Sequence, residues 1–165
     1  MIALAKLPAT SSTRCDGLTL VLDGVGDPGN AGTLIRTADA VGANQVVLTE
    51  NSADAWSPKV VRSSAGSVFH LPPIELETDE LIEKLRDENV PIIAAVAHKG
   101  ISCFEYSWPP KCALVLGHET RGISPELENA ASARVTIPVF GRAESLNVAV
   151  AGAVLMYAWR QKNGV

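Results

Sequence analysis

The chain has 165 residues, of which 47% are hydrophobic and 19% are charged, with a formal net charge of −4. This length and apolar content predict one globular domain with a sizeable core. No apolar run reaches the roughly 18 residues that a membrane-spanning helix needs, and the start lacks a charged and then apolar leader pattern, so we expect a soluble protein of the cytoplasm.

The charge and the cysteines limit the classes of partner. The negative net charge argues against a general nucleic-acid binder, although a local patch of basic residues on the surface remains an alternative. Neither the cysteines nor the histidines have metal-ligand spacing, so we expect no disulfide framework, no metal and a reducing compartment. The cysteines and histidines are Cys15, Cys103, Cys112, His70, His98 and His118. The residues that could form a local basic patch are Arg36, Lys59, Arg62, Arg121 and Arg142.

The predicted elements alternate along the chain. Residues 1–16 are interrupted by a proline and predict a lead-in segment or the stub of a linker. After them we expect strand 18–23, helix 31–41, strand 45–49, helix 58–65, an extended piece around 68–76, helix 78–88, strands 91–97 and 112–116, helix 124–130, strand 134–138 and helix 145–161. This alternation predicts an α/β fold, a parallel sheet with helices on both faces.

The first loop, GVGDPG at residues 24–29, spells G-x-G-x-x-G between an apolar strand and a helix. That pattern suggests a dinucleotide site, and Glu50 ends the next strand about where a ribose-binding acid would sit. However, residues 27–29 favour a separate turn, and Asn30 is then the better N-cap of the helix. A helix that begins after Asn30 starts too late to bind a pyrophosphate, so an NAD-dependent oxidoreductase is kept only as an alternative.

The last helix is apolar around nearly its whole circumference from Val148 to Trp159. A helix of this kind must be covered on more than one side. We expect another subunit to supply the second cover and therefore predict a homodimer through the C-terminal helix. Burial inside a monomer core is the alternative.

Three loops rich in glycine or proline each follow a predicted strand: residues 24–36, LVLGHETRGIS at 114–124, and IPVFGRAESLNVAV at 137–150. Ligands of open α/β sheets bind beyond the carboxyl ends of the strands. The three loops are therefore expected to build one functional site.

Three segments resemble, in order and spacing, the motifs of the SpoU (TrmH-type) branch of the SPOUT RNA methyltransferases: DPGNAGTLIRTADAVGA, LVLGHETRGIS and IPVFGRAESLNVAVAGAVLMY. VVRSSAGSVFHLP is similar to that family too, and the resemblance covers residues 18–160. It implies a SPOUT-type catalytic domain over residues 17–165, with a deep trefoil knot near the C-terminus and S-adenosylmethionine bound in a dimer. The stub IALAKLP resembles the point where an N-terminal RNA-binding domain joins such a domain.

The resemblance implies methyl transfer to a ribose 2′-hydroxyl of structured RNA, with ribosomal RNA favoured over transfer RNA. A non-catalytic RNA-binding or assembly protein with the same fold is the main alternative. By the family pattern the cofactor-binding residues are Gly117, Ile137 and Leu146, with Leu116, Ala97 and Val139 beside them. The polar active-site positions are Asn30, Arg36, Glu119, Ser145 and Asn147.

Arg36 is the residue on which we expect catalysis to depend most. The reaction needs an aligned O–H group and stabilisation of the charge that develops on oxygen. A guanidinium resists deprotonation, so we predict that Arg36 positions the ribose or its phosphate rather than acting as a base. Ser145 is explained equally well as a helix N-cap, and Glu119 is expected to hold its loop.

Overall fold

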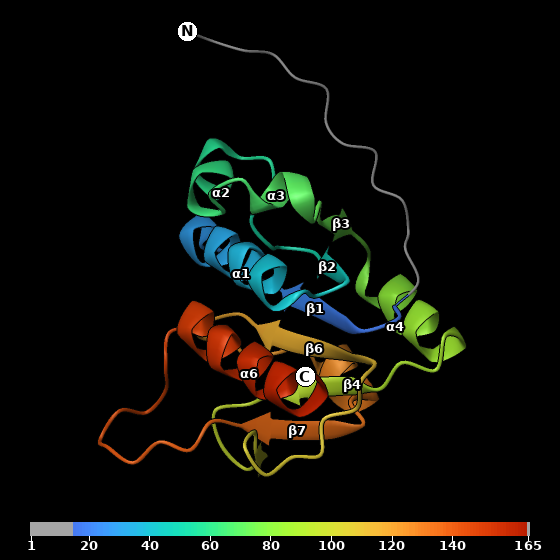
Figure 1. Cartoon of the computed structure of the whole chain (residues 1–165), viewed down its shortest axis with the longest axis vertical. Coiled ribbons are helices and arrows are strands. Elements are labelled where there is room, and N and C mark those ends of the chain that lie inside the picture. Colours follow the sequence, from blue (N-terminus) through green and yellow to red (C-terminus); the bar gives the residue numbers. More distant parts are fainter. Residues whose placement is uncertain (1–14, 165) are drawn as a thin grey trace, which may run out of the picture.

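The structure is a computed structural model that describes residues 15–164, so the predicted segment 1–16 lies almost wholly outside the described residues. A seven-stranded parallel sheet has the order β3-β2-β1-β6-β4-β7-β5 (Figure 1). The strands are β1 Leu18–Asp23, β2 Gln45–Leu48, β3 Ile74–Glu75, β4 Ile92–Ala95, β5 Ile101–Ser102, β6 Cys112–Gly117 and β7 Ala133–Thr136. The helices are α1 Pro28–Val41, α2 Pro58–Ser63, α3 Ser67–His70, α4 Thr78–Asp87, α5 Pro125–Ala130 and α6 Val148–Asn163.

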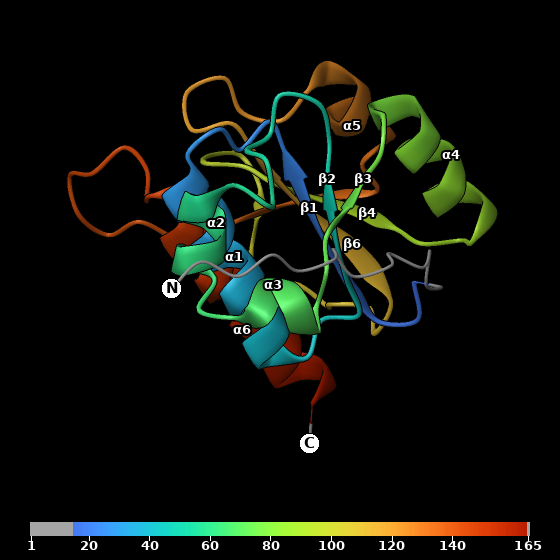
Figure 2. The same ribbon diagram turned by 90° about the horizontal axis from the view of Figure 1, so that it is seen from above.

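Strand β1 shows why the sheet has helices on both faces. All six of its residues are buried, and side chains alternate between the two faces. Leu18, Leu20 and Leu22 join a core with residues of α1 and α6, whereas Val21 joins a second core with residues of α4 and α5. Figure 2 shows α1 and α6 on one side of the strands and α4 and α5 on the other. The predicted α/β fold with a covered parallel sheet is confirmed.

Helix α1 begins earlier than the sequence predicts. Asp27, and not Asn30, is its N-cap, because a carboxylate oxygen of Asp27 accepts a hydrogen bond from the Asn30 amide at 2.9 Å. Pro28 fits the first turn, where no amide is needed. The prediction that this helix starts too late for phosphate was therefore wrong. A dinucleotide is disfavoured for a different reason, since the Asp27 carboxylate already occupies the helix N-terminus and would repel a pyrophosphate.

Several other element boundaries differ from the sequence prediction. Residues 67–70 form a turn of helix within the segment predicted to be extended, and β5 was not predicted. Helix α6 begins at Val148 rather than at residue 145, because the Asn147 side chain accepts hydrogen bonds from the amides of Ala149 and Val150 at 2.9 and 3.3 Å. The suggestion that Ser145 is the N-cap of this helix was thus wrong.

Helix α6 has one buried face and one exposed face. Gly152 lies on the buried face, where a Cβ atom would overlap Leu34 of α1 and come within 2.6 Å of Leu116 of β6. Glycine therefore lets α6 cross both elements closely. On the opposite face Val150 and Tyr157 are 52% and 55% exposed. Within the described part of the chain, no helix is long and apolar enough to cross a membrane.

The cysteines are packing residues. All three are buried free thiols. Burial raises the pKa of Cys112 to about 12, so its thiol stays neutral at ordinary pH and behaves as a small apolar side chain.

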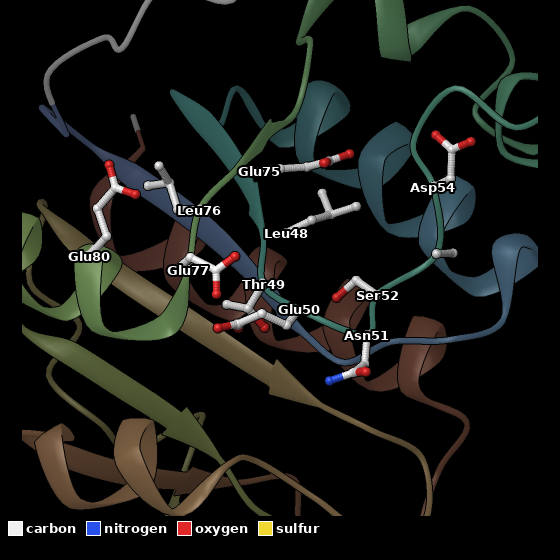
Figure 3. Close-up of a pocket in the computed structure, with 11 residues that line it drawn as sticks. Leu48, Thr49, Glu50, Asn51, Ser52, Asp54, Glu75, Leu76, Glu77 and Glu80 are labelled. Carbon is white, nitrogen blue, oxygen red and sulfur yellow. The ribbon is translucent and has the colours of Figure 1, made fainter.

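Glu50 holds the start of α4. Its carboxylate accepts hydrogen bonds from the hydroxyl and the amide of Thr78 at 2.7 and 3.0 Å. These bonds lower the pKa of Glu50 from its ordinary value of 4.5 to about 2. The neighbouring Glu77 carboxyl points toward Glu50 (Figure 3), and a hydrogen bond with Glu50, followed by repulsion from its charge, raises the pKa of Glu77. Glu50 thus has a structural partner, which leaves no support for a ribose-binding role.

This arrangement predicts an acid-dependent loss of stability. Because the folded pKa of Glu50 is depressed, its contribution is present above pH 4.5 and is lost as the pH falls toward about 2. The raised pKa of Glu77 acts in the opposite sense, since a protonated Glu77 donates a hydrogen bond to Glu50 and no longer repels it, and this offsets part of the loss. We expect Glu50→Gln to lower Tm at neutral pH by about 2–4 °C, the effect of weakening one helix cap, and to flatten the decline of Tm in acid.

Thermal unfolding followed by circular dichroism across this pH range measures both effects. Glu83→Gln, an exposed change on the same helix, is the matched control and should leave the pH profile unchanged. Parallel Tm profiles for Glu50→Gln and the wild-type protein would contradict the assignment.

Candidate active site

A cavity of about 620 Å³ opens beyond the carboxyl ends of β4, β6 and β7. Its walls are residues 95–97, residues 116–122, and the stretch between β7 and α6. These are the strand ends at which a parallel sheet normally binds ligands. All six predicted cofactor-binding residues line this one cavity: Ala97, Leu116, Gly117, Ile137, Val139 and Leu146.

Gly117 is required by the close return of the loop that follows it. The His118 and Gly122 backbones exchange two hydrogen bonds of 2.9 Å, and Gly122 has a left-handed φ of 75°. A Cβ atom at position 117 would overlap the backbone of Gly122 and Ile123. The loop is also held at its C-terminal end, because the buried Asp23 carboxylate at the end of β1 accepts a hydrogen bond of 2.6 Å from the Ser124 amide.

A row of polar side chains joins the three loops at the edge of the cavity. The Asn30 side-chain amide donates to Glu119 Oε1 at 2.9 Å, and its Oδ1 accepts from the Asn147 amide group at 3.1 Å. Asn147 Oδ1 in turn accepts from the first turn of α6. Each amide is therefore oriented by the next, and aligned hydrogen bonds of this kind strengthen one another. We call Glu119, Asn30 and Asn147 the polar row.

The two remaining predicted polar residues lie outside this row. Ser145 lines the cavity, and it has no hydrogen bond to another residue in the range 15–164. Arg36 lies on the solvent face of α1, outside the cavity lining, and has no ion pair or hydrogen bond within the same range. It is six positions further along the helix than Asn30, about 9 Å along the axis. A single chain therefore does not bring Arg36 to the polar row.

Other lining residues were missed in the sequence. Val148, Ala151 and Leu155 of α6 face the cavity, and their spacing of three and four residues is the signal that could have identified them. Thr120, Arg121 and Thr136 also line it. Of the five candidate basic residues, only Arg121 lines the cavity, and Lys59 forms an ion pair with Asp27 at 3.2 Å.

A second hollow of about 460 Å³ lies at the ends of β2 and β3 (Figure 3). Its acidic lining consists of Glu50, Asp54, Glu75, Glu77 and Glu80. In the described part of the chain no group of three or more His, Cys, Asp or Glu side chains is arranged to hold a metal. Its charge has the same sign as a nucleic acid, so a polyanion would approach the protein elsewhere.

The parallel sheet and its cavity define a class: an α/β protein with a small-molecule site between backbone loops and apolar side chains. A profile of the SpoU rRNA Methylase family matches residues 17–157. The chain belongs to this family. The dinucleotide pattern at residues 24–29 is therefore a coincidence of glycine spacing.

Curated relatives and solved structures agree with this assignment. A Bacillus subtilis (strain 168) protein named 23S rRNA (guanosine(2553)-2′-O)-methyltransferase RlmP is 40% identical over 86% of this chain and 57% of its own length. The structure of a putative TrmH-family RNA methyltransferase from Porphyromonas gingivalis superimposes with a TM-score of 0.86, 44% identity, and coverage of 93% of this chain and 63% of that one. AviRb from Streptomyces viridochromogenes, a SpoU methyltransferase in complex with AdoMet, gives 0.85 at 31% identity, covering 91% and 62%. The chain thus spans less than two thirds of these relatives.

Proposed function

We propose that this chain transfers a methyl group from S-adenosylmethionine to a ribose 2′-hydroxyl of structured RNA, with ribosomal RNA favoured over transfer RNA. The observation that carries the proposal is that the second and third motif loops line one cavity, and that Asn30 of the first loop is joined to both of them through the polar row along its edge. The family membership and the 23S rRNA named for the Bacillus subtilis relative support it. The cytoplasm is the compartment in which this function would be exercised.

The cavity fits an adenosyl cofactor by size and by chemistry. Small-molecule sites usually occupy about 300–1,000 Å³, with apolar walls and a few polar groups. Here Leu116, Ile137 and Leu146 would contact the flat adenine surface, and glycine at 117 lets backbone approach closely. When bound, S-adenosylmethionine supplies an electrophilic methyl group on its sulfonium.

The polar residues have separate tasks in this proposal. The polar row fixes the three loops relative to one another, so that the ribose hydroxyl enters in line with the methyl group. Ser145 lies free at the cavity for a substrate contact. The guanidinium of Arg36 binds the ribose or its phosphate and stabilises the negative charge that develops on the attacking oxygen.

We infer that the active form is a homodimer joined through α6. The support is the exposed apolar face of this helix, with Val150 and Tyr157, beside the α1 helix that carries Arg36. A second copy on this face would bring Arg36 of one chain to the cavity of the other. We also propose that residues 17–165 form the catalytic domain, and that the chain from β7 to α6 is threaded into the trefoil knot that the family resemblance implies.

Isothermal titration with S-adenosylmethionine and S-adenosylhomocysteine, with NAD as the control ligand, tests the cofactor proposal. Sedimentation of the same sample gives the mass of the particle. Saturable binding of the adenosyl ligands alone, followed by methyl transfer to a pool of ribosomal RNA, is the expected result. Cofactor binding with no transfer to any RNA would favour the non-catalytic alternative, and binding of NAD would favour the oxidoreductase.

Substitutions of Asn147 separate its capping role from its place in the polar row. Asn147→Asp keeps an N-cap oxygen but replaces the donor that faces Asn30 by a second oxygen, so we expect unchanged Tm and a fall in methyl transfer of about 10- to 100-fold. Asn147→Ala removes both contacts and should also lower stability by about 1 kcal/mol. Thermal unfolding and initial rates of methyl transfer measure the two effects. Full activity in Asn147→Asp would show that the row has no part in the reaction.

A further inference from the structure

The loop between β7 and α6, residues 137–147, projects from the body of the protein (Figure 1 and Figure 2). Val139 and Ser145 near its two ends line the cavity, whereas Phe140 lies outside the lining and is 96% exposed. A phenyl ring with almost all of its surface in water contributes almost no apolar burial to the fold. The ring is therefore available to a molecule that arrives at the mouth of the cavity.

Two arginines without an ion pair to a described residue belong to the loops that carry this ring and the cavity wall. Arg142 follows the ring in the same loop, and Arg121 lines the cavity from the loop after β6. Neither arginine forms an ion pair with a described residue, whereas Glu119 on the Arg121 loop already accepts a hydrogen bond from Asn30. Glu144 is the single acid in residues 137–147. The acidic side chains of the β2–β3 hollow repel a polyanion, whereas Arg121 in the cavity lining attracts one.

We propose that Phe140 stacks on an RNA base that neighbours the nucleotide whose ribose enters the cavity, and that Arg142 contacts the adjoining phosphate. This inference rests on the proposed function and adds a substrate-recognition element to it. An exposed aromatic ring beside a cation is the combination that single-stranded nucleic acid binders use, because every base has a flat π-face and every nucleotide a phosphate. Stacking of this kind tolerates sequence changes, so Phe140 contributes affinity and placement rather than base identity.

Binding of a single-stranded RNA pool by the full chain tests the proposal. An end-labelled random pool about 12 nucleotides long, within the range that single-strand binders cover, is titrated with protein saturated with S-adenosylhomocysteine at several salt concentrations. Phe140→Ala should weaken binding about tenfold at every salt concentration, with the salt slope unchanged, and Phe140→Trp should bind as the wild type does. Arg142→Ala should instead reduce the salt slope by about one.

Phe104→Ala is the matched control, because Phe104 is another exposed phenylalanine, at 52%, but lies beyond β5 and outside the cavity lining. It should bind the pool normally. In methyl transfer to ribosomal RNA, Phe140→Ala should raise KM for RNA about tenfold and leave kcat within about twofold. The affinity for S-adenosylhomocysteine and the sedimentation mass should both equal those of the wild type.

Three results would overturn the inference. Equal RNA binding by Phe140→Ala and the wild type would show that Phe140 makes no stacking contact. A wild-type protein that does not bind the pool would contradict the inference as well. A lower sedimentation mass for Phe140→Ala would instead assign the ring to an interface between copies. Failure of the proposed function is recognised separately, because it shows as absence of adenosyl-ligand binding or of methyl transfer by the wild-type chain.

Discussion

Replacing Gly117 by alanine should weaken the binding of S-adenosylmethionine by about 10- to 100-fold, the range expected when overpacking shifts a binding loop. The obstruction is rigid, because a Cβ atom at this position would overlap the backbone of Gly122 and Ile123 rather than the end of a flexible side chain. The loop of residues 118–123 must move to admit it, and that loop forms one wall of the cavity. The displacement should also lower Tm by about 3–9 °C.

Titration calorimetry with S-adenosylmethionine and S-adenosylhomocysteine measures the loss. Gly26→Ala is the control, because a Cβ atom there meets its nearest neighbour, the Gly24 carbonyl oxygen, at an ordinary 3.9 Å. Gly26→Ala should bind the cofactor normally. If Gly117→Ala bound within twofold of the wild type, the cavity would not be the cofactor site.

Replacing Arg36 by alanine should leave cofactor binding unchanged and lower the rate of methyl transfer by about 100- to 1,000-fold, the usual cost of removing one charge-stabilising donor. Binding survives because Arg36 lies outside the cavity lining. Arg36→Lys should recover little of the loss, since an ammonium lacks the planar pair of donors that a ribose oxygen or phosphate would engage. Calorimetry and single-turnover rates separate the two effects. Retention of most activity in Arg36→Lys would rule out a role for the guanidinium fork.

Mixing two impaired variants, at an S-adenosylmethionine concentration too low to occupy Gly117→Ala, decides whether Arg36 acts within its own chain. In a mixed form of the proposed dimer, the Arg36→Ala chain retains an intact cavity and the Gly117→Ala chain retains the arginine. Activity should reappear on mixing if the arginine serves the cavity of the partner chain. No recovery in a dimer shown to have exchanged subunits would place Arg36 in its own chain's site.

The core of the fold was readable from the sequence because it depends on local patterns. The apolar runs of β1 and β6 and the helical spacing in α1 predicted their elements and the parallel sheet. The rule that ligands bind beyond the carboxyl ends of strands then predicted which loops would meet. The roles given to individual residues in that cavity stay predictions.

The errors at the ends of α1 and α6 occurred where two polar side chains close in sequence could each have been the N-cap. Asn30 was assigned to the helix cap, but Asp27 supplies the cap, and this leaves the Asn30 amide for Glu119 and Asn147. The N-cap of α6 posed the same choice between Ser145 and Asn147, and the structure shows that Asn147 is the N-cap. Neighbours in sequence do not decide such cases, because Glu119 and Asn147, the partners of the Asn30 side chain, lie 89 and 117 residues away from it.

The sequence by itself determined most of the elements, the parallel sheet and the family, since hydrophobic periodicity and motif spacing are local properties of the chain. Only the tertiary structure decided that Glu50 holds α4, that the polar row crosses three loops, and that Arg36 stands apart from the row. Each of these depends on the direction in which a side chain leaves the backbone and on contacts between distant segments. Packing fixes both, and no local pattern in the sequence encodes them.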